Sequence, residues 1–193
     1  MGGDDQHKAQ SNYYTVPNLL CYARILLTPI CAYFIVGERY DLALILFFIA
    51  GLSDAVDGSL ARWFNQTSRF GQFLDPIADK FFINTVFFTL AWLEFLPWWF
   101  AIIVFTRDLL FGLAYGFSKV RKKPSDITPL AISKANTFLQ VVLGLAILGQ
   151  LLYPIHLSDL IIAVIVVVSV TSVLSAMSYF VRWLRLMRLN GIK

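Results

Sequence analysis

Six long apolar segments, separated by short polar stretches, constrain this chain of 193 residues more than any other feature. They run over residues 17–36, 42–63, 76–95, 98–119, 129–152 and 157–184. Each is close to the length of about 20 residues that a helix needs to cross the hydrocarbon core of a bilayer. In lipid, a helix satisfies the hydrogen bonds of its own backbone. We therefore expect an all-α polytopic membrane protein with six transmembrane helices.

The composition agrees with this expectation and excludes other classes. Hydrophobic residues make up 58% of the chain and charged residues only 15%, against about 45–50% and 25% in soluble domains. Disorder, a disulfide scaffold and an ordinary soluble enzyme are therefore excluded. We find no repeat or linker and expect one domain over residues 1–193, with a polar segment at 1–14 and a basic tail at 185–193. Residues 1–13 do not have the pattern of a cleavable signal peptide.

The basic residues predict the orientation in the membrane. Most of them fall outside the apolar segments or near segment ends, and on one side only. They are Lys8, Arg62, Arg69, Lys80, Lys119, Arg121, Lys122, Lys123, Arg182, Arg185, Arg188 and Lys193. The positive-inside rule then places both termini in the cytoplasm. We expect an integral protein of a bacterial cytoplasmic membrane, or of the mitochondrial inner membrane if the chain is eukaryotic. Because no basic patch is interleaved with aromatic residues, we expect no nucleic-acid partner.

Four of the twelve acidic residues lie within one stretch of 26 residues at the ends of two apolar segments. They are Asp54, Asp57, Asp75 and Asp79. A carboxylate at membrane depth costs roughly 2.5–3.5 kcal/mol on insertion scales and indicates function. The spacings of three and four residues place each pair on one helix face. A short loop between the two segments predicts antiparallel neighbours, so the four carboxylates would converge near the cytoplasmic interface.

Four converging carboxylates repel one another unless cations lie between them. Oxygen ligands favour Mg²⁺, Mn²⁺ or Ca²⁺ over zinc. Two such ions about 4 Å apart would bind a diphosphate and stabilise displacement at phosphorus, and one carboxylate could act as a general base. The alternatives are a satisfied polar network, a cation transporter and a non-catalytic membrane scaffold. A transporter usually has an internal repeat or broken helices, and the sequence has neither.

Residues 54–79 carry a longer pattern than the carboxylates alone. It reads Asp57-Gly58-x2-Ala61-Arg62-x8-Gly71-x3-Asp75-x3-Asp79, with Asp54 three residues earlier. This pattern resembles the signature of the CDP-alcohol phosphotransferase family, and the six apolar segments agree with that family's architecture. The resemblance implies an integral membrane enzyme that transfers a phosphatidyl group from a CDP-linked donor to an alcohol and releases CMP. It also implies a homodimer.

The resemblance assigns roles to the residues of the signature. Asp54, Asp57 and Asp75 would be ligands of a pair of Mg²⁺ or Mn²⁺ ions. Asp79 would complete the metal site and act as the catalytic base. The CDP group would be bound by Asp54, Asp57, Gly58, Ala61, Arg62, Gly71 and Asp75, with the small residues leaving room for it.

Three further stretches resemble the branch of this family that contains phosphatidylglycerophosphate synthases and CMP-forming cardiolipin synthases. They are residues 16–20 with Arg24, residues 106–108 and residues 129–137. The last two are more similar to the cardiolipin synthases. They imply CDP-diacylglycerol as donor and phosphatidylglycerol as acceptor, giving cardiolipin. The alternative acceptor is glycerol 3-phosphate.

Four residues are candidates for binding the acceptor and its phosphate, namely Arg107, Lys134, Asn18 and Arg24. A cation inside the membrane needs an anionic partner. Arg107 could bind a phosphate through two hydrogen bonds, and Lys134 could bind it as a point charge. The simpler alternatives are a pair between Arg107 and Asp108, extension of either side chain to the interface, and an interfacial anchor at Arg24.

Overall fold

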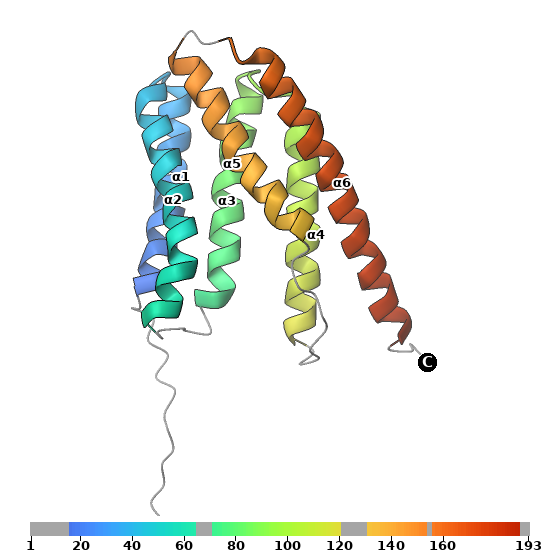
Figure 1. The fold of residues 1–193 in the computed structure, drawn as a ribbon. Helices are drawn as coiled ribbons and strands as arrows, with labels where there is room; N and C mark the ends of the chain where they lie inside the picture. Colours follow the sequence, from blue (N-terminus) through green and yellow to red (C-terminus); the bar gives the residue numbers. More distant parts are fainter. Residues whose placement is uncertain (1–15, 65–70, 121–130, 154–155, 190–193) are drawn as a thin grey trace, which may run out of the picture.

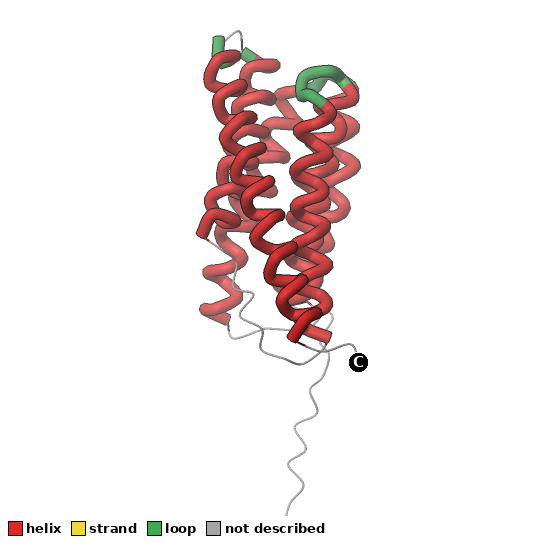
Figure 2. The backbone as a smooth tube through the Cα atoms, turned by 90° about the vertical axis from the view of Figure 1, so that its right-hand side faces the viewer, coloured by secondary structure: helices red, strands yellow, loops and turns green. Residues whose placement is uncertain are grey.

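A computed structural model describes residues 16–64, 71–120, 131–153 and 156–189 (Figure 1). Within these ranges the chain forms six α-helices and no strand, which confirms the all-α class (Figure 2). The helices are α1 (Val16–Val36), α2 (Tyr40–Phe64), α3 (Gly71–Trp92), α4 (Trp98–Val120), α5 (Ala131–Leu152) and α6 (Ser158–Leu189). The predicted polar segment at 1–14 and the end of the basic tail lie outside the described residues.

The largest difference from the predicted boundaries is at α3. This helix begins at Gly71, five residues before the apolar segment, and ends at Trp92, three residues before the segment ends. The apolar pattern misses the beginning because the first turns carry Gln72 and Asp75. Asp75 and Asp79 therefore both lie inside α3.

The helices form two groups that α5 joins (Figure 1). α1 packs against α2 and α3, and α4 packs against α3 and α6. α5 crosses diagonally and contacts α2, α3 and α6. The beginning of α3 and the end of α2 lie at one end of the bundle, which we call the acidic end. The opposite end, which we call the turn end, carries the connections α1–α2, α3–α4 and α5–α6.

Two connections at the turn end are Schellman turns with a glutamate in the left-handed conformation. After α1, the Arg39 amide donates to the Phe34 carbonyl at 2.8 Å, and Glu38 has φ 58°. After α3, the Phe95 amide donates to the Leu90 carbonyl at 2.9 Å, and Glu94 has φ 64°. This position usually holds glycine because a side chain is strained there.

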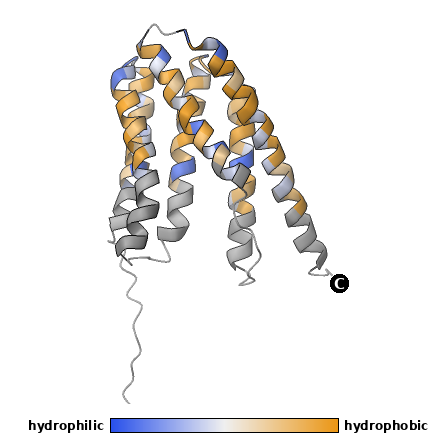
Figure 3. Ribbon diagram, in the orientation of Figure 1, coloured by the Kyte–Doolittle hydropathy of each residue, from blue (hydrophilic) through white to orange (hydrophobic). Residues whose placement is uncertain are grey.

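The core towards the turn end is apolar. Phe87, Leu90 and Phe100 are fully buried, and the rings of Phe87 and Phe100 lie 5.5 Å apart between centroids. Most residues of the described helices are hydrophobic on the hydropathy scale (Figure 3). At the crossing of α2 and α5, a Cβ added to Gly144 would clash with the Phe47 ring. Only glycine permits this close approach.

The outer surface of the bundle is also apolar. Leu26, Tyr33 and Phe138 are each at least two-thirds exposed. The described parts of α5 and α6 contain two stretches, 135–152 and 158–178, that are long and apolar enough to cross a membrane. Apolar side chains that face outwards on such helices are suited to lipid contact.

Candidate functional site

The structure places the acidic signature on two helices. Asp54 and Asp57 lie in the second half of α2, and Asp75 and Asp79 lie in the first half of α3. Both regions are at the acidic end (Figure 1). Gly71, Asp75 and Asp79 follow one another at intervals of four residues, so they lie on one face of α3.

The side chain of Asp79 is the only one of the signature that lies within the described part of the chain. The structure gives only helical backbone for the remaining members, which are Asp54, Asp57, Gly58, Ala61, Arg62, Gly71 and Asp75. The convergence of the four carboxylates therefore stays a prediction.

Asp79 forms an ion pair with Arg24 of α1. The side chain of Arg24 is 5% exposed and that of Asp79 is 22% exposed. Both side chains line a cavity of about 20 Å³, together with Gly51 of α2. Gly51 lies one turn before Asp54 in α2, so the cavity lies near the acidic part of α2 as well as near Asp79. Because Arg24 is buried and paired with Asp79, it is not the interfacial anchor that was the simpler alternative for this residue.

Arg107 lies in the middle of α4 and is 1% exposed. One of its terminal nitrogens donates to Oδ1 of Asp108 at 2.5 Å. The other donates to the carbonyl oxygen of Ser133 at 3.2 Å and to the hydroxyl of the same residue. Its Nε atom is buried without a hydrogen-bond partner. The simpler alternative, a pair with Asp108, is thus present, and binding of a phosphate by Arg107 stays a prediction.

Two residues next to this pair were not identified as site residues from the sequence. The ammonium group of Lys80 donates to Oδ1 of Asp108 at 2.5 Å, and the amide of Asn84 donates to Oδ2 at 3.0 Å. Lys80 is a residue of α3, so counting it among the loop bases that orient the chain was wrong. The available signal was the spacing of four residues between Lys80 and Asn84, which places two polar groups on one face of an apolar helix.

The first turns of α5 are also fixed by polar contacts to α6. Asn136 is fully buried, and its amide nitrogen donates to the hydroxyl of Ser172 at 2.9 Å. The hydroxyl of Thr171 donates to the amide oxygen of Asn136 at 2.9 Å. Lys134 lies between Ser133 and Asn136, but its side chain, like that of Asn18 in α1, lies outside the described residues.

The donor chemistry of the acidic end fits a hard divalent cation. Four carboxylates supply only oxygen ligands, which suits Mg²⁺ or Mn²⁺. Among the side chains that the structure describes, no group of three or more His, Cys, Asp or Glu residues is close enough to hold a metal. Three of the four predicted ligands are outside that set. The cavity that Asp79 lines together with Gly51 of α2 agrees with the predicted site.

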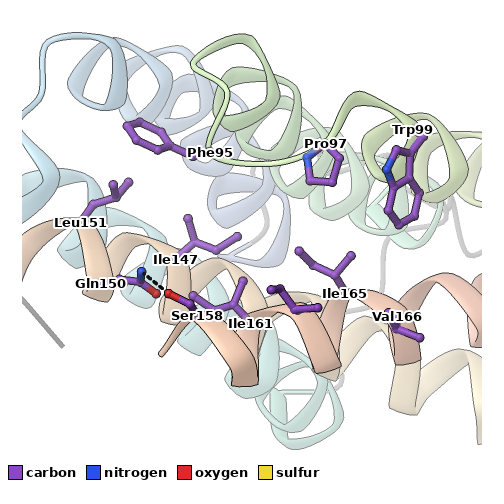
Figure 4. Close-up of a pocket in the computed structure, with 11 residues that line it drawn as sticks. Phe95, Pro97, Trp99, Ile147, Gln150, Leu151, Ser158, Ile161, Ile165 and Val166 are labelled. Carbon is purple, nitrogen blue, oxygen red and sulfur yellow. Dashed lines mark hydrogen bonds between the residues drawn. The ribbon is translucent and has the colours of Figure 1, made fainter. Parts of the chain in front are cut away.

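The larger of the described cavities lies at the other end of the molecule. It has a volume of about 360 Å³ and is lined by the α3–α4 turn, α5 and α6 (Figure 4). Its polar lining consists of Gln150 and Ser158, which form a hydrogen bond of 3.3 Å. Its lining contains no acidic or basic side chain. This cavity has no group suited to phosphoryl transfer, so the acidic end remains the candidate site.

Comparison with known proteins agrees with this placement of the site. The profile of the CDP-alcohol phosphatidyltransferase family matches residues 14–186. This range contains all four carboxylates and all six helices up to residue 186. The chain therefore belongs to the CDP-alcohol phosphatidyltransferase family, which confirms the resemblance. Together with the apolar helices, this membership identifies a membrane protein.

Curated relatives narrow the branch of the family. The chain is 34% identical over 154 residues to "Cardiolipin synthase (CMP-forming)" of Homo sapiens, covering 72% of this chain and 51% of the relative. It is 32% identical over 161 residues to "Probable cardiolipin synthase (CMP-forming)" of Drosophila melanogaster, covering 75% and 50%. It is 33% identical over 130 residues to "Cardiolipin synthase (CMP-forming)" of Streptomyces coelicolor, covering 64% and 60%. The chain spans about half the length of the first two relatives.

Proposed function

We propose that this chain is a CMP-forming cardiolipin synthase, which transfers the phosphatidyl group of CDP-diacylglycerol to phosphatidylglycerol. The family membership supports the transfer from a CDP-linked donor. The names of the relatives support phosphatidylglycerol as the acceptor. The observation that carries the proposal is the position of Asp79, which lies at the acidic end, lines a cavity together with Gly51 of α2 and forms an ion pair with Arg24.

Asp79 is the proposed general base. Its carboxylate accepts the proton from a glycerol hydroxyl of phosphatidylglycerol. The hydroxyl oxygen then forms a bond to the phosphorus that carries diacylglycerol. The bond between this phosphorus and the bridging oxygen of CMP breaks, and its electron pair leaves with CMP. Arg24 fixes the orientation of the Asp79 carboxylate, because its own side chain is almost completely buried.

The remaining signature residues are proposed to bind the donor. Asp54, Asp57, Asp75 and Asp79 would hold the Mg²⁺ or Mn²⁺ pair. When bound, these ions supply charge stabilisation for the diphosphate and the departing CMP. Gly58, Ala61 and Gly71 would let the CDP group approach the helix backbones, with Arg62 beside it.

Arg107 and Lys134 are proposed to bind the phosphate of the acceptor. Arg107 has a buried Nε atom without a hydrogen-bond partner, which is available to a phosphate oxygen. Lys134 lies next to Ser133, which Arg107 contacts. Both phosphatidylglycerol and glycerol 3-phosphate carry a phosphate, so these two cations would suit either acceptor. Asn18 on the first turns of α1 is proposed to contribute to the same pocket.

The proposed topology follows from the distribution of bases. All six helices span the membrane, both termini are cytoplasmic, and the acidic end faces the cytoplasm. The single domain extends over the whole chain and acts as a homodimer. The membrane is the bacterial cytoplasmic membrane, or the mitochondrial inner membrane in a eukaryote.

The acceptor is tested with the purified protein in vesicles that contain CDP-diacylglycerol and Mg²⁺ or Mn²⁺. Phosphatidylglycerol and glycerol 3-phosphate are offered separately, and the lipid product is identified by mass spectrometry. We expect cardiolipin and an equal amount of CMP with phosphatidylglycerol. Formation of phosphatidylglycerophosphate alone would instead assign glycerol 3-phosphate as the acceptor.

A further inference from the structure

The carboxylate of Asp108 accepts hydrogen bonds from side chains of two helices, α3 and α4. Oδ1 accepts from Lys80 of α3 and from Arg107 of α4, each at 2.5 Å. Oδ2 accepts from Asn84 of α3 at 3.0 Å. Asp108 is 5% exposed and Asn84 is 7% exposed, so these contacts lie inside the bundle. One buried carboxylate therefore holds two consecutive turns of α3 against α4.

These contacts continue to the neighbouring helices on both sides. Lys80 directly follows Asp79, which pairs with Arg24 of α1. Arg107 directly precedes Asp108 and reaches Ser133 at the beginning of α5. Two groups of polar contacts, joined through the backbone at residues 79 and 80, thus link α1, α3, α4 and α5. The ion pair of Arg24 with the proposed base lies at one end, and Ser133, the residue next to Lys134, lies at the other.

The charge of Asp108 is needed where it lies. The ammonium nitrogen of Lys80 and the contacting nitrogen of Arg107 are both 2.5 Å from the same oxygen, and therefore within about 5 Å of each other. Two like charges at this separation inside a protein repel one another strongly. Without the carboxylate between them, the two side chains would move apart and take the adjoining turns of α3 and α4 with them.

Stability alone is a poor explanation for such a network. A buried ion pair often stabilises a protein no more than apolar residues of the same size, because desolvation offsets the attraction. The network instead fixes the positions of α3, α4 and α5 relative to one another. Such positions matter because a displacement of about 1 Å at a reacting group can reduce a rate by about 100-fold. We propose that Asp108 is a positioning residue, which acts through Lys80 to place Asp79 and through Arg107 to place the beginning of α5. This inference rests on the proposed role of Asp79 as base.

The test is Asp108→Asn, which keeps the size of the side chain and removes its charge. CMP release is measured in vesicles over a range of CDP-diacylglycerol concentrations. We expect kcat to fall by about 10-fold to 100-fold, with KM for CDP-diacylglycerol changed little. The unfolding temperature should also fall, because Arg107 and Lys80 lose their anionic partner, so kcat is measured at a temperature at which the variant is folded. Asp108→Glu, which restores the charge, should regain part of kcat. The matched control is Asp41→Asn, which removes an exposed aspartate paired with Arg39 at the turn end.

Unchanged kcat in Asp108→Asn would overturn the inference, as would a kcat loss that Asp108→Glu does not reduce. If Asp108→Asn does not fold, Asn84→Ala removes one of the three donors and leaves every charge in place. Asn84→Ala should lower kcat by a smaller factor than the factor expected for Asp108→Asn. Unchanged kcat in Asn84→Ala would overturn the inference. CMP is released whichever alcohol is the acceptor, so an error in the proposed acceptor would not affect this test.

Discussion

The two ends of the bundle use charge in opposite ways. At the turn end, Glu38, Arg39 and Glu94 are exposed, and the core beneath them is apolar. Towards the acidic end, Arg24, Arg107 and Asp108 are buried and paired with one another or with Asp79. Burying a charge costs free energy that an apolar side chain would not cost. The difference agrees with the proposal that the reaction takes place at the acidic end, while the apolar turn end contributes stability.

The largest expected effect is at the acidic end. Asp79→Asn removes the proposed base while keeping its size, and we expect kcat for CMP release to fall by about 100-fold to 10,000-fold. The protein should stay folded, because the apolar core is unchanged, and should still bind a CDP-linked lipid. Steady-state kinetics and a lipid-binding assay measure the two properties separately.

The control for this comparison is again Asp41→Asn. Asp41 pairs with Arg39 at 3.3 Å, but both side chains are about half exposed. The Arg39 guanidinium lowers the pKa of the Asp41 carboxyl, so this aspartate contributes stability above its unfolded pKa and loses it as the pH falls through the lowered value. Solvent screening keeps that contribution small. Activity in Asp79→Asn equal to that of Asp41→Asn would remove Asp79 from the role of base.

A second effect, on stability, is expected where α2 and α5 cross. Gly144→Ala would place a Cβ against the buried ring of Phe47, which is itself 5.6 Å from the ring of Phe82 between centroids. Because the ring cannot move freely, we expect a loss of about 1–3 kcal/mol in the free energy of unfolding. Thermal unfolding in detergent measures it.

Gly149 is the matched control on the same helix. Nothing lies within 4 Å of a Cβ added there. Gly149→Ala should therefore be neutral or stabilise by up to about 1 kcal/mol, because alanine is the better helix former. An equal loss of stability in both variants would show that the close contact with Phe47 is not the cause.

The smallest effect is expected in the turns. Glu94→Gly relieves the strain of a side chain at φ 64°, and we expect a gain of about 0.5–1 kcal/mol after the extra chain entropy of glycine is subtracted. Glu94→Ala removes the charge but keeps the strain, so it should not stabilise. Unfolding temperatures of both variants measure the difference. A gain in Glu94→Ala equal to that in Glu94→Gly would instead attribute the effect to charge.

The sequence predicts the helices well because apolar segments long enough to cross a membrane have few alternatives to helical structure. It predicts that Asp79 belongs to the candidate site, because four acidic residues in apolar surroundings indicate a function. It does not predict the partner of Asp79, since Arg24 lies 55 positions away and only packing of α1 on α3 brings them together. Counting charges also misassigns Lys80, because a base near a helix end can face either the interface or a buried carboxylate.

The most direct test of the account is the dependence of CMP release on a divalent metal. Wild-type protein in vesicles with CDP-diacylglycerol and phosphatidylglycerol is treated with a chelator, and Mg²⁺ or Mn²⁺ is then added back while CMP is measured. The account predicts that release stops with the chelator, returns in a saturable way with the metal, and requires the acceptor. Release that continues at the same rate in the presence of the chelator would contradict a metal-dependent reaction centre at the acidic end.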